Sequence, residues 1–530
     1  MKTITNLLTA VFALISTMSL NAQTFEMVKD INHGNLDSTP EELTPTDNYL
    51  FFRATIEEQQ GQMLERLWRT DGTEAGTTII AGGQENLINP RYMVSLNGVL
   101  YFSAASEYDG NELWKTDGNS TQLVKNINLT TYAGSNPRDL TVFNNKIYFS
   151  ADNGTSGREL WVTDGTATGT HILKNIKPNG SGDPYGFTEY NGKLYFSADD
   201  GTNGDELWVT DGTTAGTQLL KDINPGGNLL NSTKYNGELY FLADDGTNGR
   251  ELWVTDGTAT GTQLLKDINP NGSSFPSQLI KYNGLLYFLA DDGTNGDELW
   301  VTDGTTAGTQ LFKDINPSGS GEPFGFTEYN GKLYFSADDG TNGFELWVTD
   351  GTSAGTQLFK DINPNGSSFP HQFIKYNGLL YFKADNGTNG DELWVTDGTS
   401  AGTQVIQPAV SPNNNPLAIK PFFTIFDGSL YFSANYDSNG QELWKLTTPN
   451  MSVKTEKLAT VNIYPNPVAN VLHIETRQEI SNLKLYSITG QHLQTWQNQT
   501  QINLATYAKG IYFLQIQTPR GIKTEKIIKK

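Results

Sequence analysis

The chain has 530 residues, which is more than one compact domain needs, and it contains no cysteine. Disulfides and thiol catalysis are therefore excluded, and the fold must be stabilised by packing. The formal net charge of -22 disfavours binding to nucleic acid or to an anionic membrane surface.

Residues 1–22 have the pattern of a secretory signal peptide. Lys2 gives the basic start, Leu7 to Leu20 form the apolar stretch, and Ala22 precedes the expected cleavage site before Gln23. That stretch is shorter than the roughly 20 residues of a membrane-spanning helix. No other segment is apolar enough to span a bilayer, so we expect an exported mature chain without a transmembrane segment.

A Leu-Trp pair recurs through residues 23–447 at spacings of 45 to 50 residues, most often 47, and its tryptophans are Trp68, Trp114, Trp161, Trp208, Trp253, Trp300, Trp347, Trp394 and Trp444. Each unit contains four short β-type runs, which in the fourth unit are residues 186–190, 193–197, 206–210 and 217–221. The Asn191-Gly192 pair between the first two runs is a strong hairpin signal. The pattern predicts an all-β fold, a β-propeller of about 47-residue four-stranded blades.

The two ends of the repeat region complement each other. Residues 24–32 match the fourth run of a unit but precede the first one, whereas the ninth unit lacks its fourth run after Trp444. We therefore expect the N-terminal strand to complete the last blade and close the ring. The count stays open between eight and nine blades, because the first unit carries the insertion 57–63 and has Arg66 where the others have Glu.

An alanine and a glycine precede each of the last eight tryptophans at fixed distances, as in Ala198, Gly204 and Trp208. This spacing resembles the tryptophan-docking motif of quinoprotein propellers, in which small neighbours clamp the indole. We expect blade packing from it, and no quinone. The whole unit is similar to the ELWxxDGT repeat of secreted bacterial proteins, a resemblance that implies no particular activity.

Aromatic residues occupy the connections between units, where the chain passes from one blade to the next. Two loops return almost unchanged, at residues 182–187 and 321–326 and at residues 273–276 and 367–370. The expected contact residues for a ligand are Tyr185, Phe275, Phe324 and Phe369. The alternative is that these rings pack against the neighbouring blade.

Acidic loops that contain glycine precede the tryptophans and offer closely spaced oxygen atoms of the kind that calcium prefers. The candidate ligands are Asp199, Asp200, Asn203, Asp244, Asp245, Asp291, Asp292, Asp338 and Asp339. Their spacing differs from that of an EF-hand, and the plainer interpretation is an acidic hairpin turn. No cofactor other than calcium is suggested.

The repeated acidic residues outside these loops are interpreted as structural. The aspartate of each Thr-Asp-Gly-Thr run should accept bonds from the amides that follow it, as Asx residues do. The glutamate before each Leu-Trp pair should be hydrogen-bonded to a neighbouring strand or turn, because a buried lone carboxylate is costly.

No nucleophile, phosphate or zinc signature is present, so we do not expect an enzyme. Residues that break the symmetry of the repeat could still meet over a channel, and the candidates are His171, His371, Arg91 and Arg138.

The composition changes after the repeats. Residues 448–459 read as a linker, and residues 460–530 contain alternating apolar runs that predict a small β-sandwich. The Tyr464-Pro465-Asn466-Pro467 start and the lysine-rich end resemble the type A sorting domain of the type IX secretion system. The resemblance implies a Bacteroidetes-type cell, and contact of residues 460–530 with that machinery before the chain is released or anchored at the surface.

The sequence thus favours an exported, non-catalytic propeller that binds a surface glycan or a protein ligand. The alternatives are an enzyme that acts on extracellular polysaccharide in the channel, and a calcium-dependent adhesion or structural component.

Overall fold

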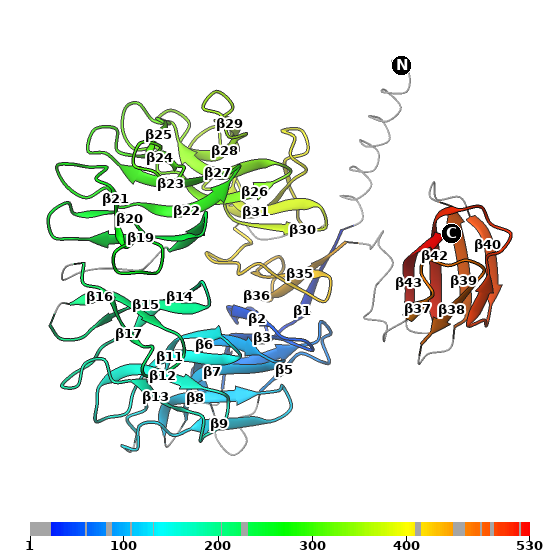
Figure 1. Cartoon of the computed structure of the whole chain (residues 1–530), viewed down its shortest axis with the longest axis horizontal. Coiled ribbons are helices and arrows are strands. Elements are labelled where there is room, and N and C mark those ends of the chain that lie inside the picture. The colour runs from blue at the N-terminus through cyan, green and yellow to red at the C-terminus, as the bar shows by residue number, and fades with distance from the viewer. Residues whose placement is uncertain are drawn as a thin grey trace. The chain divides into compact units, whose positions relative to one another are not determined.

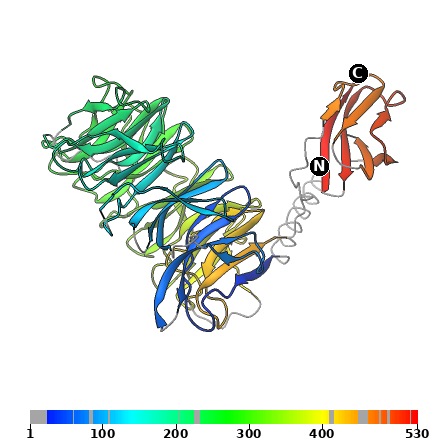
Figure 2. The same ribbon diagram turned by 90° about the horizontal axis from the view of Figure 1, so that it is seen from below.

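The computed structural model describes residues 23–58, 61–80, 87–106, 109–130, 132–202, 204–223, 232–408, 415–448, 462–476, 480–487, 492–518 and 521–530. The signal peptide predicted at 1–22 and all but the first residue of the linker predicted at 448–459 lie outside these residues. Every element in the described part of the chain is a strand (Figure 1, Figure 2). The chain divides into two compact units, Met1–Thr447 and Thr448–Lys530.

The described strands of the first unit form nine four-stranded antiparallel sheets, numbered here in chain order. Sheets 1 to 3 are β2 (Glu41–Pro45), β3 (Leu50–Glu57), β4 (Met63–Thr70), β5 (Thr78–Ile79); β6 (Ile88–Leu96), β7 (Val99–Ser106), β8 (Gly110–Thr116), β9 (Thr121–Lys125); and β10 (Arg138–Phe143), β11 (Lys146–Asp152), β12 (Arg158–Thr163), β13 (His171–Lys174). Sheets 4 to 6 are β14 (Tyr185–Tyr190), β15 (Lys193–Asp199), β16 (Asp205–Thr210), β17 (Gln218–Lys221); β18 (Thr233–Tyr235), β19 (Glu238–Asp244), β20 (Arg250–Thr255), β21 (Gln263–Lys266); and β22 (Ser277–Tyr282), β23 (Leu285–Asp291), β24 (Asp297–Thr302), β25 (Gln310–Lys313). Sheets 7 to 9 are β26 (Phe324–Tyr329), β27 (Lys332–Asp338), β28 (Phe344–Thr349), β29 (Gln357–Lys360); β30 (His371–Tyr376), β31 (Leu379–Asp385), β32 (Asp391–Thr396), β33 (Gln404–Val405); and β34 (Thr424–Phe426), β35 (Ser429–Ala434), β36 (Glu442–Thr447) with β1 (Thr24–Lys29).

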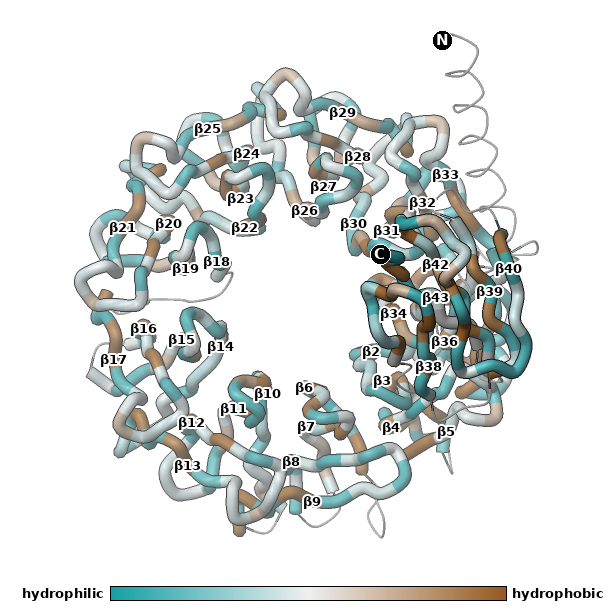
Figure 3. The backbone as a smooth tube through the Cα atoms, turned by 45° about the vertical axis from the view of Figure 1, so that its right-hand side comes forward, coloured by the Kyte–Doolittle hydropathy of each residue, from teal (hydrophilic) through white to brown (hydrophobic). Residues whose placement is uncertain are grey.

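The first strand of each sheet lies toward the centre of this unit and is called its inner strand (Figure 3). Inner strands contact their counterparts in neighbouring sheets; β2, for example, contacts both β6 and β34. Consecutive four-stranded meanders with their first strands innermost are the architecture of a β-propeller.

The second and third strands are buried on both faces, because each sheet packs between two others. Leu194, Tyr195 and Phe196 of β15 are all at most 1% exposed, so the run is continuously apolar rather than alternating. The two strands pair in register, with Phe196 opposite Trp208.

Each tryptophan packs in a core shared by two sheets. Trp208 shares its core with Ala198 of its own sheet and with Tyr148 and Leu160 of the preceding sheet. The expected role of the indole in blade packing is confirmed, and the partner sheet is the preceding one. A further core of the same kind joins sheet 9 to sheet 1 through Tyr431 and Trp68.

The N-terminal strand β1 pairs antiparallel with β36 and is the fourth strand of sheet 9. Met27 lies opposite Trp444, and the Ile31 amide donates to Glu442 Oε2 over 3.0 Å. The N-terminal strand expected within residues 24–32 thus takes the place of the fourth strand that the ninth repeat lacks.

The first sequence repeat, whose insertion left open whether it is a blade, forms the four-stranded sheet 1. Arg66 is only 5% exposed and replaces the usual glutamate with the opposite charge. It donates through Nη1 to the carbonyl of Leu87 at 2.9 Å and through Nε to Glu58 Oε1 at 2.7 Å. The insertion therefore supplies the counter-charge for the residue that breaks the pattern.

The glutamate before most Leu-Trp pairs holds the connection to the next sheet, whereas Glu392 accepts from Asn386 and Asn389 of its own sheet. Glu251 is fully buried and accepts hydrogen bonds from the amides of Ile268 at 2.9 Å and Ser274 at 3.0 Å, and from Ser274 Oγ at 2.5 Å. Burial raises the pKa to about 7 for Glu159 and Glu298 and to about 8 for Glu442. Glu159 and Glu298 accept from the amides of Gly182 and Gly321, where Glu251 has Ser274.

The Thr-Asp-Gly-Thr aspartates form the predicted turns. Asp211 Oδ1 accepts from the Thr213 amide at 2.8 Å and from Thr213 Oγ1 at 2.7 Å. The hydroxyl and amide of Thr213 hold the pKa of Asp211 below its usual value.

The described strands of the second unit form two sheets around one core. They are β37 (Asn462–Tyr464), β38 (Val471–Glu475) and β41 (Gln501–Asn503), and β40 (His492–Gln497), β39 (Asn482–Ser487), β42 (Gly510–Thr518) and β43 (Gly521–Lys529). Buried Leu472 from the first sheet and Leu485 and Leu514 from the second share that core, which is the layering of a small β-sandwich.

Candidate binding surface on the inner strands

The four aromatic residues predicted to contact a ligand occupy two different positions of the repeat. Tyr185 and Phe324 are the first residues of inner strands β14 and β26. Phe275 and Phe369 instead precede Pro276 and Pro370, in the connections that lead into β22 and β30. The four rings therefore do not form one repeated circle of equivalent residues.

Two of these rings are widely exposed. Phe275 is 52% exposed and Phe369 is 48% exposed. The Arg250 guanidinium lies 5.9 Å from the centre of the Phe275 ring. Phe369 stacks on Phe344, with ring centres 4.9 Å apart and planes inclined by 22°.

The other two rings are held within their own sheets. Phe324 packs at a ring-centre distance of 5.9 Å from Phe344. The Tyr185 hydroxyl donates to Asp205 Oδ2 at 3.3 Å, and burial with the nearby Asp205 charge raises the pKa of Tyr185 to about 12.

The acidic loops proposed to bind calcium are closed by their own amides. Asp245 Oδ1 accepts from the amides of Thr247 at 2.9 Å and Asn248 at 2.8 Å, and Asn248 Nδ2 donates to Oδ2. The residues that repeat this arrangement are Asp292 and Asp339, while Asp200 accepts from Thr202.

The first aspartate of each loop accepts from the loop glycine, as at Asp199, Asp244, Asp291 and Asp338. The Asp199 carboxylate also accepts from Lys177 Nζ at 2.5 Å, which holds its pKa below the usual value. Asn203 lies outside the described residues. No group of three metal-ligating side chains occurs in the described part of the chain, and calcium binding stays a prediction.

The sheets differ from one another at three neighbouring positions, called the rim positions. They are the residue near the start of the inner strand, its partner on the second strand, and the residue two before the leucine of the Leu-Trp pair on the third strand. In sheets 1–4 and 6–8 they are Glu41, Arg53 and Glu65; Arg91, Ser103 and Asn111; Arg138, Ser150 and Arg158; Tyr185, Ser197 and Asp205; Ser277, Leu289 and Asp297; Phe324, Ser336 and Phe344; and His371, Lys383 and Asp391.

The charged rim positions of sheets 1, 2 and 8 pair with opposite charges, whereas Arg138 and Arg158 of sheet 3 are both cationic. In sheet 1, Arg53 Nη1 donates to Glu65 Oε1 at 2.5 Å, and Arg91 from sheet 2 reaches Glu65 Oε2 at 2.5 Å. In sheet 8, the buried Lys383 pairs with Asp391 at 2.6 Å. Burial lowers the pKa of the neighbouring His371.

Three of the four symmetry-breaking candidates occupy rim positions, but they belong to separate sheets. Arg91, Arg138 and His371 lie on β6, β10 and β30. His171 begins β13, the outermost strand of sheet 3, so it lies away from the inner strands.

A β-bulge follows the first rim position, and sequence reasoning missed it. The pairing of most inner strands shifts there, and one residue takes a left-handed backbone conformation. It is a glycine at Gly186 (φ 70°) and Gly325 (φ 73°), and elsewhere Glu42, Tyr92, Asp139, Gln278, Gln372 and Phe422, at φ 53° to 57°. Left-handed backbone disfavours side chains such as these.

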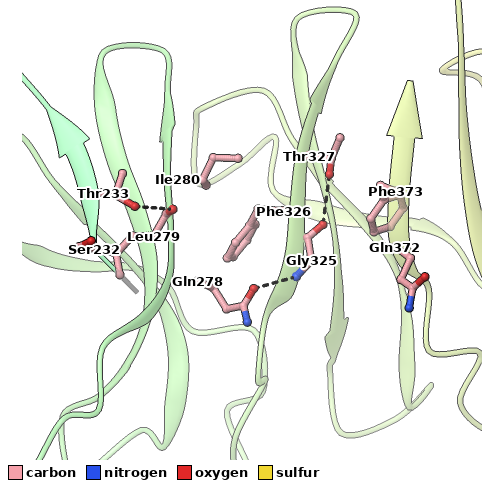
Figure 4. Close-up of a pocket in the computed structure, with 10 residues that line it drawn as sticks. All are labelled: Ser232, Thr233, Gln278, Leu279, Ile280, Gly325, Phe326, Thr327, Gln372 and Phe373. Carbon is pink, nitrogen blue, oxygen red and sulfur yellow. Dashed lines mark hydrogen bonds between the residues drawn. The ribbon is translucent and has the colours of Figure 1, made fainter. Parts of the chain in front are cut away.

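A groove of about 410 Å³ crosses the inner strands at these bulges (Figure 4). It extends from Ser232 and Thr233 across β22 and β26 to Gln372 and Phe373. A second groove of about 360 Å³ lies on β2, β6 and the β34 region, and Glu42, Tyr92 and Phe422 contribute to it.

The only hint of these residues in the sequence is that the two positions after the proline vary in the connections that lead into sheets 1–4 and 6–8. Arg138-Asp139 becomes Tyr185-Gly186, then Ser277-Gln278.

The solved structures similar to this chain include propellers of peptidases. The β-propeller domain of the Trilobed protease from Pyrococcus furiosus is 9% identical, with 70% of this chain and 99% of that chain covered and a TM-score of 0.34. A puromycin-hydrolyzing peptidase from Mycobacterium tuberculosis is 9% identical over 78% of this chain and 60% of that chain, with a TM-score of 0.39.

The extracellular domain of a one-component system from B. thetaiotaomicron is 11% identical, with 93% of this chain and 86% of that chain covered and a TM-score of 0.30. These likenesses concern the fold alone. No curated protein matches the chain in sequence.

No described helix has the length and apolarity of a membrane span. Residues 462–530 match the family model described as the secretion system C-terminal sorting domain. The second unit therefore carries a type IX secretion sorting domain, and the protein is exported to the cell surface or the medium.

Proposed function

We propose that the first unit is a closed nine-bladed propeller, sealed by β1, which binds a glycan or a protein ligand outside the cell without catalysing a reaction. The cyclic order of shared cores and the pairing of β1 with β36 support the closed ring.

The rim positions carry the binding proposal. The repeats preserve the same buried Leu, Tyr, Phe and Trp residues, so they form an internal alignment in which structural positions stay constant. Against that constancy the rim holds charges in sheet 1 and aromatic rings in sheet 7. Variation at one end of the inner strands suits a surface that presents different groups to one ligand.

The test is binding of the full chain to an array of extracellular polysaccharides and to surface proteins of the producing cell, with and without calcium. We expect saturable binding that weakens when Phe275, Phe324 and Phe369 are replaced by alanine. A chain that binds nothing in either condition would contradict the proposal.

A second candidate function is cleavage of extracellular polysaccharide, which one observation favours. Glu42 contributes to the second groove, and burial raises its pKa, as a general acid requires. Arg53 Nε lies 3.5 Å from Glu42 Oε1. Release of reducing ends by the full chain, abolished by Glu42→Gln, would establish this activity.

A further inference from the structure

The groove across sheets 5 to 8 is uncharged, although the chain is strongly acidic. Its lining residues are serine, threonine, glutamine, glycine, leucine, isoleucine and phenylalanine, and none of them ionises. The chain contains 58 aspartates and glutamates, and the second groove contains Glu42. A charged ligand would lack a partner here, whereas a neutral one meets no repulsion.

Two glutamines in this groove have a left-handed backbone conformation, which is unfavourable for residues with a side chain. Gln278 has φ 57° and Gln372 has φ 55°, whereas sheets 4 and 7 have Gly186 and Gly325 at the same position. Glycine would adopt this conformation freely, so the side chains are present despite a cost to the fold. Backbone strain of this kind is typical of functional sites.

The two glutamines lie on either side of β26, with Gly325 between them (Figure 4). Gln278 Oε1 accepts from the Gly325 amide at 3.3 Å, which fixes the orientation of its side-chain amide. A Cβ at Gly325 would lie 3.4 Å from the Phe373 ring, so the glycine keeps the space beside that ring open. An amide offers both donors and an acceptor, the combination that hydroxyl groups require.

Aromatic rings complete the groove. Phe326 and Phe373 line it, and the exposed Phe369 lies in the connection that leads into the strand of Gln372. Apolar rings beside a few polar groups are the usual composition of a small-molecule site, and about 410 Å³ falls within the roughly 300–1,000 Å³ of such sites.

We propose that this groove binds a neutral oligosaccharide, whose hydroxyls are recognised by the amides of Gln278 and Gln372 and whose apolar sugar faces contact Phe326 and Phe373. The inference rests on the proposed binding function and names its ligand class. A sugar chain without carboxylates or sulfates combines the hydroxyls, the apolar faces and the lack of charge that the groove requires.

The experiment measures binding of the full chain to matched arrays of neutral, uronic-acid and sulfated oligosaccharides, and then the affinity of the best neutral one. The double variant Gln278→Gly/Gln372→Gly introduces glycine, the residue that sheets 4 and 7 have at this position as Gly186 and Gly325. We expect at least a tenfold loss of affinity with no decrease in the melting temperature. The matched control is Asn283→Gly/Asn377→Gly, which changes left-handed hairpin residues of the same two sheets and should bind within twofold of the parent.

Two results would overturn the inference while the proposed function stands: an unaltered affinity in the glutamine variant, or binding of charged glycans or proteins alone. A chain that binds no glycan and no protein would refute both.

Discussion

The buried glutamates predict that the propeller is less stable at mildly alkaline pH than at mildly acidic pH. Burial raises the pKa of Glu159 and Glu298 from 4.5 to about 7 in the folded chain. Between these values the folded state binds protons that the unfolded state has lost, so stability is fully present below pH 4.5 and decreases until about pH 7. From about pH 5.5 to about pH 8 each group should remove about 2 kcal/mol, since one pKa unit corresponds to about 1.4 kcal/mol.

The assay is urea unfolding followed by tryptophan fluorescence at both pH values, with the Glu159→Gln/Glu298→Gln variant beside the parent. The parent should lose about 4 kcal/mol more than the variant over this interval. His371, whose lowered pKa acts in the opposite direction, contributes equally to both proteins and cancels. Equal pH dependence of the two proteins would refute the reasoning, whatever the absolute stabilities.

Three further predictions concern the connections, the loops and the N-terminal strand. Ser274→Ala removes the hydroxyl that donates to Glu251 and should destabilise the fold by about 1.5–3 kcal/mol at about pH 8. The control is Ser273→Ala, whose hydroxyl accepts from the Arg250 amide and whose loss should lower the stability less. Equal shifts of the urea midpoint in the two variants would contradict this prediction. A calcium chelator should leave the melting temperature unchanged, because amides already satisfy Asp245, Asp292 and Asp339, and a decrease would support the calcium hypothesis. Deletion of residues 23–32 should lower the melting temperature and promote aggregation, because it exposes the edge of β36 and removes the Ile31 donor of Glu442; an unchanged melting temperature would show that β1 does not stabilise the unit.

The elements that could be predicted from the sequence depend on local signals. Asn191-Gly192 specifies the hairpin between β14 and β15, and Asp211 accepts from the Thr213 amide two residues away. A period near 47 then repeats these local elements, so four-stranded sheets follow without any long-range knowledge.

The details of the candidate site were not predictable because they depend on pairing between strands. Phe344 stacks on Phe369 and packs on Phe324, yet the three belong to different segments of the chain. The bulge that places Gln278 arises from the register between β22 and β23. The charge reversal at Arg66 likewise depends on Glu58 of the insertion, which only the folded chain brings beside it.

The pairing of β1 with β36 has a consequence for the order of folding. The first strand of the repeat region pairs with the last strand of that region, and Ile31 and Glu442 are separated by 411 residues. The intervening sheets are local meanders that can form as they emerge, whereas sheet 9 stays incomplete until the repeat region is finished. A prematurely terminated chain would keep an unpaired β1 segment and an unsealed sheet surface, which are the features that aggregation and proteolysis act on. The topology therefore couples completion of sheet 9 to synthesis of the whole repeat region.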